Sequence, residues 1–265
     1  MQLDAGGAAS TPGVMIHAPI EHGALAAGRF RSSAATHAGT VRARNEDNYV
    51  NRPDLGLWAV ADGAGGHQAG DVASRIVTDA LRTVPPGLGA GELLAEIRQR
   101  ISEAHDALCV EAARCGPNAI CASTIVVLLA RNDYYACLWA GDSRGYLLRG
   151  GRLRQLTRDH SLVQKLFDAG AISAAETLRH PSANIITRAV GAETLELDKV
   201  TDRLFPGDRF LLCSDGLFKT VPEASLAEGL AADEDNPAER LLAVALARRA
   251  DDNVTAVTIE VLREG

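Results

Sequence analysis

The sequence predicts a layered α+β domain, in which antiparallel sheets are covered by amphipathic helices. Two polar turns, Arg131–Asp133 and Arg149–Arg152, each join two strand-like segments, and such pairs form β-hairpins. In other segments apolar residues recur at helical spacing. Because hairpins build antiparallel sheets and each helix has one apolar face to bury, these elements are expected to stack in layers.

Six short segments rich in apolar residues are expected to be strands. Several of them are continuous apolar runs, which are typical of strands that are covered on both faces. The six segments are Leu57–Ala61, Thr124–Ala130, Tyr134–Ala140, Gly145–Arg149, Phe210–Cys213 and Thr255–Val261.

Three longer segments are expected to be helices. The first, Ala69–Leu81, begins directly after a glycine-rich loop. The second has an apolar stripe at spacings of three and four and extends over about twenty residues. In the third, Asn236 is the expected N-cap, Pro237 the first helical residue and Glu239 the capping-box partner. The stripe of the second helix consists of Leu94, Ile97, Ile101, Ala104 and Leu108.

Length and composition predict one globular domain. The chain has 265 residues, of which 46% are hydrophobic and 23% charged, and this composition is sufficient for a full core. Residues 1–32 are rich in Ala and Gly without a sustained period, so we expect a flexible leader there. No long Pro/Gly/Ser linker follows, and residues 33–265 are expected to form a single domain.

The distribution of charge and cysteine excludes several classes of partner. The net charge is −7 and no Lys/Arg-rich block occurs, which argues against binding to nucleic acid, although the acidity could equally serve solubility alone. Five cysteines without a CxxC motif lie mostly in apolar segments, which is typical of reduced thiols in the cytosol. No apolar run reaches the roughly eighteen residues needed to span a bilayer. We therefore expect a cytoplasmic monomer that does not bind membranes.

Acidic residues beside the strand-like segments are the most informative feature of the sequence. Asp62 and Asp215 each end an apolar segment and precede a glycine, and Asp252 comes just before the last segment. One such Asp-Gly pair alone is an ordinary turn. Three carboxylates that meet at one place would supply the hard oxygen ligands that Mg²⁺ or Mn²⁺ requires.

An arginine precedes another acidic pair near the start of the domain. Arg42 lies four residues before Glu46 and Asp47, and its planar guanidinium is suited to bind a phosphate through two parallel hydrogen bonds. Together with the strand-end aspartates, this arginine predicts a metal-dependent phosphatase.

An ordered set of motifs resembles the bacterial branch of the type 2C protein phosphatases, the metal-dependent PPM family of Ser/Thr phosphatases. The resemblance extends over roughly residues 33–262. It implies a four-layer α-β-β-α sandwich of two antiparallel sheets flanked by helices, with a binuclear Mn²⁺ or Mg²⁺ site at one edge. The motifs are Arg-x-x-Asn-Glu-Asp, Ala-Asp-Gly-x-Gly-Gly-His, Gly-Asp-Ser-Arg, Leu-Thr-x-Asp-His, Cys-Ser-Asp-Gly-Leu and Asp-Asn-Val-Thr.

The resemblance implies a ligand set for two core ions and for a third, weaker one. Asp62 would bridge both core ions, and the carbonyl oxygen of Gly63 would bind the second. Asp215 and Asp252 would complete the shell of the first ion. Asp142, in the Gly-Asp-Ser-Arg motif, matches the position that binds the additional ion in bacterial members.

The resemblance also implies roles outside the direct metal shell. Glu46 and Asp47 would act mainly through metal-bound waters, and Arg42 would bind the phosphate of the substrate. His67 would protonate the leaving alkoxide, although a surface loop histidine is the alternative at this position. Ala64 departs from the methionine that is usual in bacterial relatives, a change expected to alter packing rather than ligation.

The expected substrates are phosphorylated proteins, produced by a cognate Ser/Thr kinase. Residues 158–190 resemble the variable flap subdomain beside the catalytic cleft, with a merely structural insertion as the alternative. Two other functions were weighed. A phosphohydrolase of small phosphoesters would use the same chemistry, whereas an inactive phosphopeptide-binding module would have lost a core aspartate, and every expected ligand position is filled.

Overall fold

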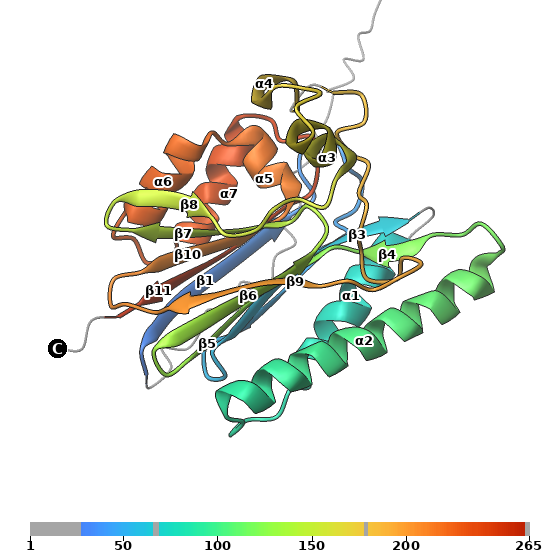
Figure 1. Ribbon diagram of the computed structural model, residues 1–265. Helices are drawn as coiled ribbons and strands as arrows, with labels where there is room; N and C mark the ends of the chain where they lie inside the picture. The colour runs from blue at the N-terminus through green and yellow to red at the C-terminus, as the bar shows by residue number, and fades with distance from the viewer. Residues whose placement is uncertain (1–27, 66–68, 178–179, 263–265) are drawn as a thin grey trace, which may run out of the picture.

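Two antiparallel sheets form the centre of the molecule, and helices cover the outer face of each (Figure 1). The computed structural model describes residues 28–65, 69–177 and 180–262. This arrangement is the four-layer α-β-β-α sandwich that the type 2C resemblance predicted. The first sheet has the order β1 (Phe30–His37), β11 (Val254–Val261), β10 (Arg209–Cys213), β7 (Arg144–Arg149) and β8 (Arg152–Gln155).

The second sheet contains the strand that includes the predicted metal ligand Asp62. Its order is β2 (Asp47–Arg52), β3 (Leu57–Gly65), β5 (Ile125–Arg131), β6 (Tyr134–Ala140) and β9 (Asp198–Arg203), and β4 (Cys121–Ser123) pairs with the end of β3. All of these pairs are antiparallel.

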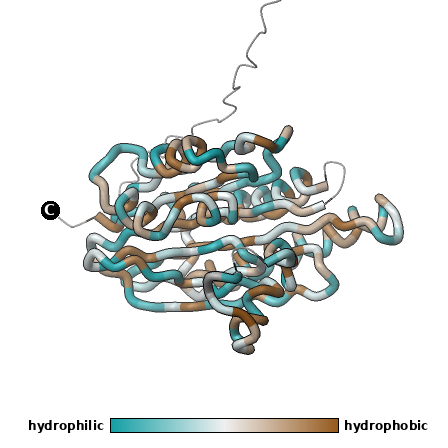
Figure 2. Tube along the Cα trace, turned by 90° about the horizontal axis from the view of Figure 1, so that it is seen from above, coloured by the Kyte–Doolittle hydropathy of each residue, from teal (hydrophilic) through white to brown (hydrophobic). Residues whose placement is uncertain are grey.

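Strand β3 shows why the apolar runs are continuous. Leu57, Ala59 and Ala61 pack with the helices on the outer face, and Trp58 and Val60 point into the core between the two sheets. Because successive side chains of a strand point to opposite faces, a strand buried on both faces must be apolar at every position. Figure 2 shows hydrophobic stretches interleaved with hydrophilic ones throughout the fold, as expected for a core made of several layers.

Helices form the two outer layers. On the second sheet lie α1 (Ala69–Arg82) and α2 (Ala90–Cys115). The predicted stripe of α2 is buried there from Ile97 to Leu108, but at its first position Leu93 is buried and the predicted Leu94 only partly so. On the first sheet lie α5 (Asp215–Thr220), α6 (Glu223–Ala231) and α7 (Pro237–Ala247). The side chain of Asn236 caps α7 by accepting a hydrogen bond from the Glu239 amide, with Pro237 in the first turn, as predicted. None of the helices in the described ranges is both long and apolar enough to cross a bilayer.

The flap, defined as residues 158–190, contains two short helices, α3 (Leu162–Asp168) and α4 (Ala174–Thr177). Residues 178 and 179 lie outside the described parts of the chain. In Figure 1 these helices lie above one edge of the sandwich, close to the start of α5.

Several strands were not predicted, because their sequences are polar or small rather than apolar. Strand β1 has the sequence FRSSAATH, β2 has DNYVNR and β9 has DKVTDR. Residues 1–27 of the expected leader lie outside the described residues, but Phe30–Ser32, which were assigned to the leader, belong to β1. These strands pair because neighbouring strands offer a hydrogen-bonding edge, and an apolar pattern does not reveal that.

Candidate metal centre

Two of the predicted acidic residues face each other across neighbouring strands. The register of β2 and β3 pairs Asp47 with Asp62. Asp47 is only 4% exposed, and its Oδ2 accepts hydrogen bonds from the hydroxyls of Ser214 (2.6 Å) and Thr255 (2.7 Å). Its Oδ1 is buried without a hydrogen-bond partner among the described residues. Like charges directly opposite in a sheet destabilise it, so this pair requires a cation or a proton.

Burial and mutual repulsion raise the pKa values of these carboxyls. Burial raises the pKa of Asp47 to about 7, against the hydrogen bonds of its two hydroxyl donors, and the charges of Asp215 and Asp252 raise it further. The pKa of Asp62 lies well above its usual range because of burial and then of the charges of Asp47, Asp215, Asp142 and Asp252. Five carboxylates, contributed by widely separated parts of the chain, are therefore close enough to repel one another.

The backbone around Asp62 is held by the end of β4, by Thr124 just before β5, and by the start of α1. The Asp62 amide donates to Thr124 Oγ1 (3.0 Å), and Ser123 Oγ donates to the Asp62 carbonyl (3.0 Å). A Cβ atom on Gly63 would lie 1.9 Å from the Gly70 carbonyl oxygen. Only glycine therefore allows this close approach of helix and strand end. His67, the predicted proton donor, follows this segment and lies outside the described residues.

Asn253 holds the Arg42–Asp47 segment against the start of β11. Its Oδ1 accepts a hydrogen bond from the Glu46 amide (2.8 Å), and its Nδ2 donates to the Arg44 carbonyl (2.8 Å). Burial raises the pKa of Glu46, and Arg42 lowers it only in part. This role of Asn253 was not predicted, although the residue lies in the quoted Asp-Asn-Val-Thr motif.

Asp142 lies at the end of β6, on the same side as the other carboxylates. It is only 5% exposed. Burial, followed by the charge of Asp215, raises its pKa to about 7, although Lys219 acts in the opposite direction. The neighbouring Ser143 hydroxyl shares a hydrogen bond of 2.8 Å with Thr124 Oγ1, the atom that accepts from the Asp62 amide. The end of β3, which contains Asp62, and the turn after β6 that contains Asp142 are thus connected.

Cationic side chains bind the two remaining predicted ligands. Lys219 Nζ donates to Asp215 Oδ2 (2.5 Å), and the Arg42 guanidinium donates to Asp252 Oδ2 (2.8 Å). In the part of the chain that the structure describes, no three His, Cys, Asp or Glu side chains already stand in the arrangement of a metal shell. The residues nevertheless suit a divalent cation, because Asp47 Oδ1 is buried without a partner and all the donors are hard oxygens.

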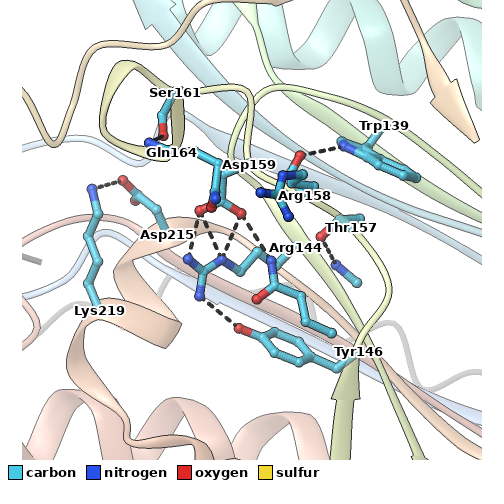
Figure 3. Close-up of polar contacts among 12 residues, drawn as sticks. Trp139, Arg144, Tyr146, Thr157, Arg158, Asp159, Ser161, Gln164, Asp215 and Lys219 are labelled. Carbon is cyan, nitrogen blue, oxygen red and sulfur yellow. Dashed lines mark hydrogen bonds and ion pairs between the residues drawn. The ribbon is translucent and has the colours of Figure 1, made fainter. Parts of the chain in front are cut away.

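A second charged cluster lies beside the carboxylates and was not predicted (Figure 3). The Arg144 guanidinium donates to both carboxylate oxygens of Asp159 (2.6–3.1 Å) and to the Tyr146 hydroxyl (3.1 Å). It also lies 3.7 Å from the ring centroid of Phe218 in α5. Arg144 and Asp159 both occur in the quoted motifs. The motifs do not indicate, however, that these two side chains form an ion pair.

His160, next to Asp159, has contacts that suit a structural role. Its ring stacks on Trp139, its Nδ1 accepts from the Gly141 amide (3.3 Å), and its Nε2 faces Asp198 Oδ2 (3.2 Å). Burial lowers its pKa, which keeps the ring neutral over a wider pH range.

Comparison with known proteins identifies relatives along most of the chain. The family model described as protein phosphatase 2C matches residues 37–253. The Ser/Thr protein phosphatase PstP of Mycobacterium tuberculosis is 36% identical over 88% of this chain, which spans 45% of that longer protein. The Ser/Thr phosphatase stp of Listeria welshimeri is 35% identical over 85% of this chain and 93% of its own length.

Solved structures show the same architecture. PppA of Pseudomonas aeruginosa, described as a key regulatory component of T6SS, superposes with a TM-score of 0.82 and 40% identity over 89% of this chain and 99% of its own. The catalytic domain of PstP, solved in complex with two manganese ions, superposes with a TM-score of 0.80 and 35% identity. That comparison covers 89% of this chain and 99% of the PstP domain.

Proposed function

The chain belongs to the protein phosphatase 2C family, and from that premise we propose that it hydrolyses phosphoserine and phosphothreonine in proteins at a binuclear Mn²⁺ or Mg²⁺ centre. The type 2C family inferred from the sequence motifs is thereby confirmed. The chain spans about half the length of the mycobacterial relative, so its activity and substrates are proposals. The observation that supports them is the group of buried carboxylates around Asp47 and Asp62, whose negative charge is not fully neutralised by basic side chains.

The carboxylates have assigned roles in this proposal. Bound ions would lower the pKa of a shared water and neutralise charge on the phosphoryl oxygens. Asp62 would bridge the two core ions, with the Gly63 carbonyl on the second and Asp215 and Asp252 on the first. Glu46 and Asp47 would orient water ligands, and Asp142 would hold an additional, weaker ion.

In this proposal Arg42 would receive the phosphate. Its side chain is 56% exposed, and its ion pair with Asp252 keeps the guanidinium beside a proposed metal ligand. An exposed ion pair of this kind contributes little stability, so the guanidinium can exchange its partner for a phosphate at small cost. The planar fork would then hold two phosphoryl oxygens and orient the phosphate for attack by water.

The remaining roles rest on the family resemblance. His67 would give a proton to the departing serine or threonine alkoxide, a step suited to a group that titrates near neutrality. The substrates would be phosphoproteins made by a cognate kinase, rather than nucleic acids or membrane lipids. We further propose a cytoplasmic monomer with one catalytic domain over residues 33–265 and a flap that shapes substrate access.

Turnover of a phosphothreonine peptide with and without Mn²⁺ tests the proposal. Activity should disappear in EDTA and return with Mn²⁺ better than with Zn²⁺, because the shell contains no soft ligand. Free phosphoserine and a nucleotide monophosphate serve as matched substrates. Faster turnover of either than of the peptide would favour a small-molecule phosphohydrolase, and peptide turnover after exhaustive chelation would refute the metal mechanism.

A further inference from the structure

Lys219 connects the proposed metal centre to the flap. Its Nζ donates to Asp215 Oδ2 (2.5 Å) and to Asn184 Oδ1 (2.8 Å). Figure 3 shows the lysine reaching from α5 toward Asp215. Asp215 begins α5 at the end of β10, whereas Asn184 belongs to the flap. A single ammonium group therefore joins two parts of the molecule that are 31 residues apart in sequence (184 to 215).

The residues around this ammonium form a small cavity below the flap, with polar and apolar side chains in its lining. The cavity has a volume of about 60 Å³, and Lys219 and Asp142 line it together with the flap residues Ser161, Gln164 and Ala183. Space of this size accommodates a few waters. The end of the lysine side chain therefore has room to leave Asp215 without unpacking the core.

The neighbouring residue anchors α5 independently of this link. Phe218 packs under the guanidinium of Arg144, which is itself bound to Asp159. Lysine is rare in this chain. It occurs only at Lys165, Lys199 and Lys219, and arginine is used at every other Lys/Arg position. An ammonium on a flexible stem changes partners more readily than a bidentate guanidinium. The structure thus combines a fixed contact at 218 with an exchangeable one at 219.

We propose that Lys219 is a positioning residue that links the flap to Asp215, and that a divalent cation bound at Asp215 weakens this link. The inference rests on the proposed function, because it takes Asp215 as a metal ligand. A cation at this carboxylate competes with the ammonium for the same oxygens and repels it. The displaced ammonium then loses its hydrogen bond to Asp215 and can bind only the uncharged amide oxygen of Asn184, so Asn184 is no longer connected to Asp215. The position of the flap would follow the loading of the metal centre.

Hydrogen exchange of residues 180–190, measured with and without Mn²⁺, tests this inference. In the unchanged protein Mn²⁺ should accelerate exchange in this segment. Lys219→Met and Asn184→Ala should both exchange fast without metal and show no further acceleration with Mn²⁺. Lys199→Met removes the same charge from an exposed position on β9 and should respond as the unchanged protein does.

Calorimetric titration with Mn²⁺ separates the two halves of the link. Lys219→Met should bind Mn²⁺ several-fold more tightly, because a competing cation is removed from Asp215. Asn184→Ala breaks only the contact to the flap and should bind Mn²⁺ with nearly unchanged affinity. Protection of β5 from exchange verifies that each variant is folded, and Asn184→Ala decides the test if Lys219→Met does not fold.

Two results would overturn the inference. Slow flap exchange in both metal-free variants would show that the link does not restrain the flap. An equal response to Mn²⁺ in Lys219→Met and in the unchanged protein would show that the lysine does not couple the two sites. If the unchanged protein binds no Mn²⁺, the proposed function and the coupling both fail, and the metal-free variants still report whether the link restrains the flap.

Discussion

Two groups of poorly exposed charges lie side by side in this protein, and they are neutralised in opposite ways. In the first, Asp47 and Asp62 face each other, and one carboxylate oxygen of Asp47 has no partner among the described residues. In the second, Asp159 accepts hydrogen bonds from Nε and one terminal nitrogen of the Arg144 guanidinium and from the Gln155 amide (3.1 Å). Only the second group is neutralised by the protein alone.

Under the proposed function, this difference distinguishes a group that binds cations from a group with a structural role. Unpaired carboxylates in a desolvated place destabilise the folded chain unless a cation or a proton joins them. Natural proteins keep such an arrangement where function requires it. The Arg144–Asp159 pair holds the β7–β8 side of the site and the flap-side loop together, and it leaves no charge for a ligand to satisfy.

The largest expected effect is on turnover, from Asp62→Asn. This change removes the proposed bridging carboxylate, so activity should fall by more than the roughly 10- to 100-fold typical of residues behind metal ligands. The metal-free variant should be at least as stable as the unchanged protein, since a repelling charge is lost. Peptide turnover and urea unfolding in EDTA measure the two quantities. Near-native turnover with near-native Mn²⁺ affinity would refute the bridging role.

Asp159→Asn should decrease the stability of the folded protein, whereas Asp62→Asn should not. It leaves the Arg144 guanidinium, 18% exposed, without its charged partner, and breaking such a pair costs about 3 kcal/mol or more of unfolding free energy. Asp79→Asn is the control, because it breaks an exposed ion pair with Arg82 that is worth at most about 1 kcal/mol. Equal stability of the two variants in urea would remove the distinction between the two groups.

Arg42→Ala should separate substrate binding from metal binding. Losing charged hydrogen bonds to phosphate is worth about 1.5–3 kcal/mol, which corresponds to a rise in KM of about 10- to 100-fold. Mn²⁺ affinity should stay the same or increase slightly, because Asp252 loses its ion-pair partner. Arg42→Lys should recover only part of the loss. Weakened Mn²⁺ binding with an unchanged KM would assign Arg42 to the metal centre instead.

The smallest effect is a pH dependence of stability in the metal-free protein. The pKa values of Asp47 and Asp142 are raised to about 7 in the folded state, so they bind protons that the unfolded chain has released. Their stabilising contribution is complete below about pH 4 and is lost as pH rises to about 7.

Urea unfolding at pH 5.5 and pH 8 in EDTA measures this loss. Saturating Mn²⁺ should abolish it, since a cation stabilises the ionised carboxylates, and Asp47→Asn should reduce it. If the metal-free protein is equally stable at the two pH values, the carboxyls around Asp47 and Asp62 do not have raised pKa values in the folded state.

Local patterns predicted the strands that are buried on both faces and the helices with apolar stripes. The strand Tyr134–Ala140 has the predicted bounds, and α1 and α7 begin where the loop and cap signals indicated. The edge strand β9 was missed, since most of its residues are exposed and polar and no apolar period marks it. A strand of that kind is determined by its partner β6 rather than by its own sequence.

The sequence by itself determined which side chains are available to the site, namely the aspartates beside the strands and Arg42, and their order along the chain identified the family. Tertiary structure alone decided which charges meet. The register of β2 and β3 opposes Asp47 to Asp62, and the return of the chain after β8 brings Asp159 to Arg144. It also placed Lys219 between Asp215 and Asn184. These contacts join residues far apart in sequence, and no local pattern encodes a distance that arises only when the layers pack.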